Sequence, residues 1–155
     1  MMAESPCGRR LRCRKGQPSD SPSLAAQERR SGHVPNTIVI FEDDAFLLDA
    51  YQLKLSSNNE WNAITFSDGE SAVARIKDAQ PDVVVLDLLM PKKSGIEILR
   101  EMQADPQTKS IPVIVATNLG QRDIVNEALA LGAKDYFIKS ETKISEILQA
   151  AKKYL

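Results

Sequence analysis

The chain has 155 residues, about the size of one domain with a tail, and its 43% hydrophobic and 26% charged content is ordinary for a soluble protein. No run of 18 apolar residues is present, so the sequence predicts no membrane span. The net charge of −1 divides unevenly, because residues 1–36 hold seven basic and three acidic residues, which leaves −5 for the remainder. A globular part with this negative charge repels the phosphate backbone of nucleic acids. We therefore expect no direct DNA binding.

Residues 1–36 are rich in Ser, Pro, Arg and Gly and lack apolar periodicity, which predicts a disordered basic tail. Its cluster RRLRCRK could contact nucleic acid or an acidic partner, but a solvated tail is the simpler interpretation. Both cysteines, Cys7 and Cys13, lie in this tail and fit no disulfide framework or zinc spacing. Together with the absence of a secretory signal, this favours a reducing, cytoplasmic location.

From Thr37 onward, short apolar runs alternate with segments of helical periodicity. The expected strands are TIVIF (37–41), WNAITF (61–66), VVVLD (83–87), IPVIVAT (111–117) and AKDYFIK (133–139). A helix follows each strand, and the apolar faces we expect are Leu47, Ala50, Tyr51 and Leu55; Ala72, Val73 and Ile76; Ile96, Leu99 and Met102; Ile124, Ala128 and Leu131; and Ile144, Ile147, Leu148 and Ala151. This alternation predicts an α/β protein with a doubly wound, five-stranded parallel sheet covered by helices on both faces.

Polar side chains gather where these strands end, and the carboxyl ends of parallel strands meet at one edge of a sheet, where ligands bind. They are Glu42, Asp43 and Asp44 at the end of the first strand, Ser67 and Asp68 at the end of the second, Asp87 at the end of the third, Thr117 and Asn118 at the end of the fourth, and Lys139 and Ser140 at the end of the fifth. Each has an ordinary explanation alone, such as a helix cap or a turn. Asp87 is the exception, because four buried-type residues lead directly into it.

The combination of these residues indicates a particular chemistry. Crowded carboxylates need a cation, and Mg²⁺ is the hard ion that one or two carboxylates bind together with phosphate oxygens. A lysine and a hydroxyl opposite them would face a phosphoryl group, and an aspartate can itself be the nucleophile that receives it. The sequence therefore predicts a magnesium-assisted site that places phosphate on a carboxylate.

The segments IVIFEDD, VVVLDLLMPKKSGIE, PVIVATN and GAKDYFIK resemble the receiver domain of bacterial two-component response regulators, of the chemotaxis-regulator type. The resemblance covers residues 37–155 and implies a flavodoxin-like (βα)₅ fold with strand order 2-1-3-4-5. It implies that Asp87 accepts phosphate from a sensor histidine kinase or a phosphotransfer protein. Asp43 would bind Mg²⁺ directly and Glu42 mainly through water, with Asp87 and the backbone carbonyl of Leu89 as further ligands.

The resemblance also assigns the remaining site residues. Lys139 would pair with the phosphoryl oxygens, while Thr117 and Tyr136 would move on activation and reshape the face of the fourth helix, fifth strand and fifth helix. A downstream protein target would read that face, and a phosphorylation-dependent homodimer is a further option. Because the chain stops after the fifth helix, we expect a stand-alone regulator that catalyses only its own phosphorylation and dephosphorylation.

The sequence departs from the receiver pattern at two positions near the site. Ser140 replaces the usual cis proline after the lysine, so we expect a peptide that is either trans or strained. Asn118 replaces a smaller residue after Thr117, and its bulk should narrow access to Asp87. In addition, Leu89 and Leu119 cannot hydrogen-bond an attacking water, which predicts slow loss of the phosphoryl group.

Other functions fit less well. A phosphatase of the haloacid-dehalogenase type needs a second acid at the position of Leu89, and a flavodoxin-like flavin carrier would not have the acidic EDDAFLL after its first strand. No GxxxxGK[ST] motif indicates a nucleotide hydrolase. The remaining alternative is a degenerate receiver that acts as a phosphorylation-independent docking module.

Overall fold

The computed structural model describes residues 35–57 and 59–155, and the predicted disordered tail therefore lies almost wholly outside the described residues. The strands are β2 (Asn36–Phe41), β3 (Trp61–Phe66), β4 (Val83–Leu86), β5 (Val113–Thr117) and β6 (Asp135–Ile138). The helices are α3 (Ala45–Ser56), α4 (Ala72–Ala79), α5 (Gly95–Ala104), α6 (Arg122–Ala130) and α7 (Ile144–Lys152). Across the described part of the chain, no helix is both long and apolar enough to cross a bilayer.

All five strands run parallel in one sheet of order β3-β2-β4-β5-β6, which is the predicted order 2-1-3-4-5. The order reverses between β2 and β4, so the chain first builds outward to β3 and then returns to the other side of β2. Ligands of open α/β sheets bind at this point, outside the carboxyl ends of the strands. The fold thus places the ends of β2 and β4 side by side.

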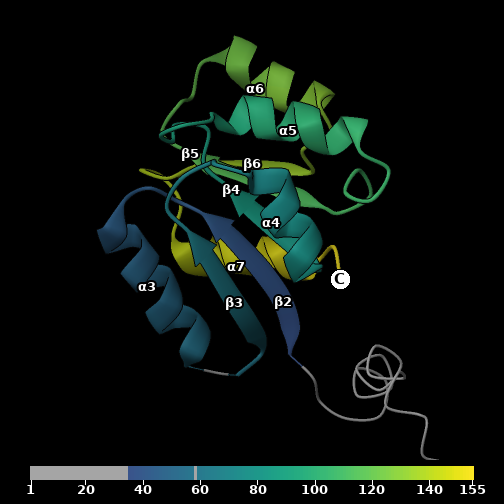
Figure 1. The fold of residues 1–155 in the computed structure, drawn as a ribbon. Coiled ribbons are helices and arrows are strands. Elements are labelled where there is room, and N and C mark those ends of the chain that lie inside the picture. Colours follow the sequence, from purple (N-terminus) through teal and green to yellow (C-terminus); the bar gives the residue numbers. More distant parts are fainter. Residues whose placement is uncertain (1–34, 58) are drawn as a thin grey trace, which may run out of the picture. The chain divides into compact units, whose positions relative to one another are not determined.

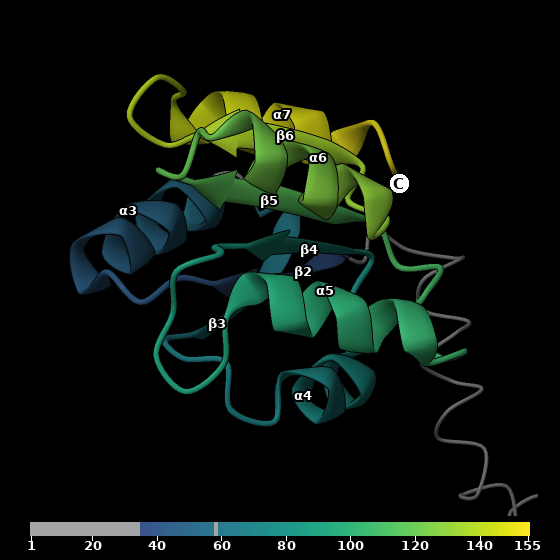
Figure 2. The ribbon, with the colours of Figure 1, turned by 90° about the horizontal axis from the view of Figure 1, so that it is seen from above.

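Helices cover both faces of the sheet (Figure 1), and Figure 2 shows the layers from above. One hydrophobic cluster joins α4, α5 and α6 to the side chains of Val39, Val84 and Val115. The other joins α3 and α7 to Ile38, Val85 and Ile114. Neighbouring residues of β2 and β4 therefore serve opposite faces, which explains why 83–86 is a continuous apolar run with no polar alternation.

The predicted strand at 61–66 is confirmed to the residue, the third ends at Leu86, one residue before the expected 87, and the fourth begins two residues later than expected. Ile111 closes a turn by donating to the Thr108 carbonyl, and the nitrogen of Pro112 has no hydrogen to donate to a sheet ladder. The fifth strand is likewise shorter at both ends than the expected 133–139.

The helices follow the predicted faces with small corrections. In α5 the side chain of Ile98 is fully buried and that of Ile96 only partly, so the apolar face is rotated slightly from the predicted one. In α3 the fully buried positions are Tyr51 and Leu55. Gly132 follows α6 with φ of +101°, as expected of the left-handed residue that ends a helix.

Candidate functional site

The first two acids of the site are placed by the end of β2. The Glu42 N–H donates to the Phe66 carbonyl at 3.0 Å, which extends the β2–β3 ladder by one bond and buries the Glu42 side chain. Asp44 caps α3, because its Oδ1 accepts the N–H groups of Phe46 and Leu47. Asp43 lies between these two fixed residues with its side chain exposed at the strand end.

The end of β4 places Asp87 in the same way. Its N–H donates to the Phe41 carbonyl at 3.0 Å, and its side chain is only 4% exposed. The first turn of α5 crosses directly over this strand end, since a Cβ on Gly95 would collide with the Asp87 carbonyl and lie 2.7 Å from the Leu88 Cα. A glycine at position 95 therefore allows the backbone of α5 to approach the residue that carries the carboxylate.

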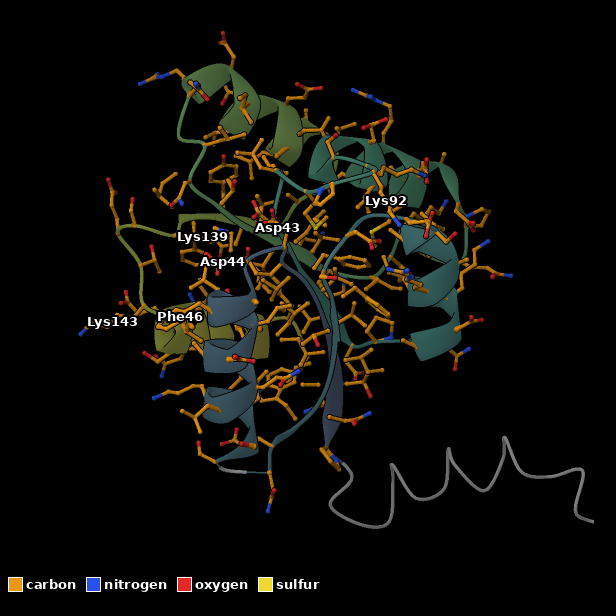
Figure 3. All side chains as sticks on the ribbon, turned by 60° about the vertical axis from the view of Figure 1, so that its left-hand side comes forward. Asp43, Asp44, Phe46, Lys92, Lys139 and Lys143 are labelled. Carbon is orange, nitrogen blue, oxygen red and sulfur yellow. The ribbon has the colours of Figure 1, made fainter. Side chains whose placement is uncertain are left out.

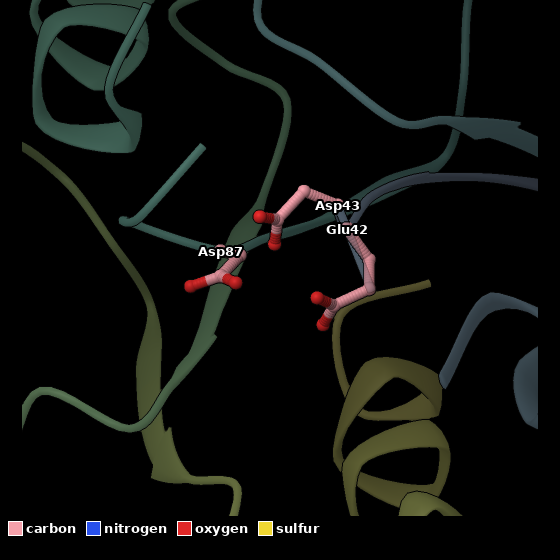
Figure 4. Close-up of side chains that lie close together, drawn as sticks. All are labelled: Glu42, Asp43 and Asp87. Carbon is pink, nitrogen blue, oxygen red and sulfur yellow. The ribbon is translucent and has the colours of Figure 1, made fainter. Parts of the chain in front are cut away.

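The three carboxylates converge as predicted (Figure 4). One oxygen from each of Glu42, Asp43 and Asp87 lies within 4.8 Å of the other two, and no other group of His, Cys, Asp or Glu in the described ranges converges in this way. An all-oxygen set of this spacing suits a hard cation such as Mg²⁺, which takes carboxylate ligands and retains water. We call these three residues the acidic site.

Lys139 reaches the acidic site from the end of β6 (Figure 3), and its ammonium group lies 2.8 Å from both Glu42 Oε2 and Asp87 Oδ2. The side chain of Lys139 is 12% exposed and those of the two acids are 3% and 4% exposed. Charge-assisted bonds of this length in a buried setting fix the ammonium between the two carboxylates.

These contacts shift the protonation of the site. Burial raises the pKa of Glu42, although the bond from Lys139 and the Asp44 N–H partly oppose it. Burial would lower the pKa of Lys139, but its hydrogen bonds to Asp87 and Glu42 outweigh that effect, and the pKa is raised. Lys139 therefore stays charged, while Glu42 takes up a proton more readily than an exposed glutamate.

The predicted switch residues form one connected set beside the acidic site. Thr117 is fully buried, and its hydroxyl accepts the Leu119 N–H at 3.4 Å. The Tyr136 hydroxyl donates to the Leu119 carbonyl, so both side chains hold the same loop residue. Burial, followed by the charge of Asp87, raises the pKa of Tyr136, so its hydroxyl keeps its proton.

The remaining predicted positions are placed as follows. The Leu89 N–H donates to Asp87 Oδ1 at 3.2 Å, and the side chain of Leu89 is 54% exposed beside the site. Metal binding by the Leu89 carbonyl stays a prediction. The Lys139–Ser140 peptide is trans, because no cis peptide occurs among the described residues.

The sequence did not predict the contact made by Asn118. Its side chain is exposed, and Oδ1 accepts the Ser140 N–H at 3.1 Å, which links the β5–α6 loop to the β6–α7 loop. The sequence did contain a signal for this contact, because both Asn118 and Ser140 depart from the receiver pattern. Ser140 has the backbone N–H that the usual proline lacks. That Asn118 narrows access to Asp87 stays a prediction.

Comparison with protein families identifies the family to which this fold belongs. The model of the response regulator receiver domain matches residues 38–152, which contain every residue of the acidic site and its lysine. The chain belongs to the response regulator receiver family. It is thus a signalling domain of two-component systems, in which a divalent metal site of this kind is typical.

Curated relatives agree with the receiver assignment. The chain is 38% identical to protein CcdB of Bacillus subtilis over 112 residues, 70% of this chain and 91% of that protein. It is 33% identical to the chemotaxis protein CheY of Thermotoga maritima over 103 residues, 66% of this chain and 83% of that protein. It spans only 46% of the probable transcriptional regulator TcrX of Mycobacterium tuberculosis, at 32% identity over 72% of this chain.

Solved structures show the same receiver fold. The phosphorylated cyanobacterial phytochrome response regulator RcpA aligns with a TM-score of 0.67 at 30% identity, over 77% of this chain and 90% of that chain. The Mn²⁺-bound form of the response regulator Rcp1 aligns with a TM-score of 0.65 at 28% identity, over 77% of this chain and 91% of that one.

Proposed function

We propose that this receiver takes a phosphoryl group onto Asp87 from a phosphohistidine of a sensor histidine kinase or a phosphotransfer protein. The observation that carries the proposal is the convergence of three carboxylates within 4.8 Å, with the Lys139 ammonium 2.8 Å from two of them. The phosphorylated state of RcpA and the metal-bound state of Rcp1 support it by similarity.

In the proposed step an oxygen of Asp87 forms a bond to phosphorus as the phosphorus–nitrogen bond of the phosphohistidine breaks. The bonding electron pair leaves with the imidazole ring. The Lys139 ammonium, already held beside Asp87 Oδ2, would need to move little to compensate charge on the phosphoryl oxygens. Mg²⁺, held by Asp43, Glu42 and the Leu89 carbonyl, would neutralise the carboxylates and the phosphoryl oxygens.

Activation would follow from the set of contacts around Leu119. If Thr117 turns toward a phosphoryl group on Asp87, its hydroxyl no longer accepts the Leu119 N–H. Leu119 is then free to shift, and its carbonyl, which accepts the Tyr136 hydroxyl, shifts with it. The change would pass to α6, β6 and α7, the face that a downstream protein or a second copy of this chain would bind. This is a shift between two packings caused by a new charge.

The test is incubation with acetyl phosphate and Mg²⁺ followed by intact-mass measurement. We expect a gain of one phosphoryl group that is absent in Asp87→Asn and absent after chelation of the metal. Asp49→Asn, which removes an exposed acid of α3, is the matched control and should be modified like the wild type. No mass change in the wild type would contradict the proposal and favour a phosphorylation-independent docking module.

A further inference from the structure

We propose that Asn118 is a positioning residue, whose side-chain carbonyl holds the β6–α7 loop and thereby fixes Lys139 at the acidic site. Asn118 Oδ1 accepts the N–H of Ser140, the residue that directly follows the lysine. The two residues are 22 positions apart in the chain and belong to loops that leave neighbouring strands. The bond therefore joins the loop after β5 to the loop after β6.

The position of this bond in the sheet explains why it acts on Lys139. The last paired residues of β5 and β6 are Thr117 and Ile138, and the Lys139 N–H still donates to the Thr117 carbonyl at 2.9 Å. The next amide, that of Ser140, has no strand to pair with and donates to the Asn118 side chain instead. The side chain thus adds one bond between the two loops, directly beyond the end of the β5–β6 ladder.

Both peptide groups that flank the Cα of Lys139 are consequently held. With the peptide planes on either side fixed, the direction of the Cα–Cβ bond of Lys139 is fixed as well. From there the side chain spans to Glu42 Oε2 and Asp87 Oδ2, at 2.8 Å each. The torsions of the lysine stem must absorb any displacement of the backbone, and few combinations of them keep the ammonium in contact with two carboxylates at once, because charge-assisted bonds are short and directional.

The chemistry of the bond requires both residue types. Position 140 needs a residue with a backbone N–H, which proline does not have, and position 118 needs an acceptor of the length of Asn. These are the two positions at which the sequence departs from the receiver pattern. The structure shows them bonded to each other, so the two departures form one feature.

The bond is exposed at both ends, so its loss should loosen the loop and leave global stability nearly unchanged. NMR on the metal-free, unphosphorylated protein tests this directly. In Asn118→Ala we expect the Ser140 amide to exchange about two- to tenfold faster, the factor expected for one hydrogen bond. We also expect the ¹⁵N and ¹H signals of the Lys139 ammonium to shift, because its two carboxylate contacts weaken.

Two variants serve as matched controls. Asn118→Asp keeps the acceptor in the same shape and should restore slow exchange at Ser140, and a comparison at low and high salt separates the effect of its added charge. Ser140→Ala keeps the backbone N–H and should leave the Lys139 signals in place. Unchanged Lys139 signals in Asn118→Ala would overturn the proposal. It would also be overturned if, at high salt, the Ser140 amide exchanged as fast in Asn118→Asp as in Asn118→Ala.

A second experiment measures the rate of phosphorylation and therefore rests on the proposed function. Asn118→Ala should slow phosphorylation by acetyl phosphate, and Ser140→Pro should add little further loss in the double variant, because both changes remove the same bond. If the two substitutions slowed phosphorylation additively in the double variant, the proposal would be contradicted. If the wild type takes no phosphate, the proposed function fails, and the Lys139 signals still decide the role of Asn118.

Discussion

The ammonium of Lys139 separates two buried carboxylates, Glu42 and Asp87, that would otherwise be adjacent like charges. An ion pair this buried loses hydration, and it persists because both acids contact the same cation and also accept backbone N–H groups. Burial nevertheless raises the pKa of Glu42. A second cation at the acidic site would add attraction for both carboxylates.

Magnesium affinity should therefore depend on the protonation of Glu42. Because the pKa of Glu42 is raised, its protonated form accumulates at a higher pH than for an ordinary glutamate, and a protonated carboxyl cannot bind the ion. We expect Mg²⁺ affinity, measured by calorimetry, to fall as the pH is lowered from about 8 to about 5. Glu42→Gln should bind more weakly and with a flatter pH profile, whereas an unchanged profile would contradict this role.

The lifetime of the phosphoryl group is a second property of single residues. Leu89 is exposed beside Asp87, while Leu119 is partly buried and packs against the hydrophobic core. A polar side chain at position 89 could therefore reach an attacking water, and one at position 119 could not do so without leaving the core. We expect Leu89→Asn to speed phosphate loss by about tenfold, equivalent to about 1.4 kcal/mol of barrier.

The measurement is the decay of the phosphorylated mass after acetyl phosphate is removed. Leu89→Ile is the control, because it keeps an apolar side chain and should decay as slowly as the wild type. A wild-type lifetime of seconds, or faster decay in the Ile variant than in the Asn variant, would show that the leucine is not the cause.

At the scale of elements, the start of α5 determines how Asp87 is presented. Ser94 caps the helix and forms a capping box with Glu97, and Gly95 lets the first turn contact the end of β4. We expect Gly95→Ala to destabilise the fold by about 1–3 kcal/mol in urea unfolding, because the added methyl collides with backbone atoms that cannot move aside.

Gly120→Ala is the matched control for this change. An added Cβ there would meet only the end of the Ile138 side chain, at 3.2 Å, and that side chain can rotate. The control should therefore unfold close to the wild-type urea concentration. Equal effects of the two substitutions would show that the approach of α5 to Asp87 is not the sensitive contact.

The elements also show how far sequence reasoning reaches. The strand at 61–66 was predicted to the residue and that at 83–87 to within one residue, because an apolar strand that ends in a polar residue marks its own boundary. The convergence of Glu42, Asp43 and Asp87 followed from their strand ends alone. A strand end indicates where a residue lies but not where its side chain points.

The direction of a side chain depends on tertiary neighbours that periodicity does not record. Asn118 was therefore interpreted by its bulk, although its functional group turns to the Ser140 N–H. The rotated face of α5 has the same origin, since burial of Ile98 rather than Ile96 is decided by how the helix lies on the sheet.

At the scale of the whole receiver, the acidic site is connected more closely to the β6 edge of the sheet than to the β3 edge. Thr117 and Tyr136 both contact Leu119 in the loop that leads into α6, and Lys139 precedes the loop that leads into α7. In contrast, α4 follows β3, which pairs with β2 and forms the edge of the sheet opposite β6. A charge placed on Asp87 should therefore perturb the side of α6, β6 and α7.

Amide hydrogen exchange with and without acetyl phosphate and Mg²⁺ tests this asymmetry. We expect exchange rates in the β5–α6 loop, α6, β6 and the start of α7 to change by about fivefold or more, the factor expected for a coupling free energy of about 1 kcal/mol. Rates in α4 should stay the same, which makes that helix an internal control. Asp87→Asn should abolish every change, while changes that spread equally to α4 would mean that the phosphoryl group loosens the whole domain instead of shifting one face.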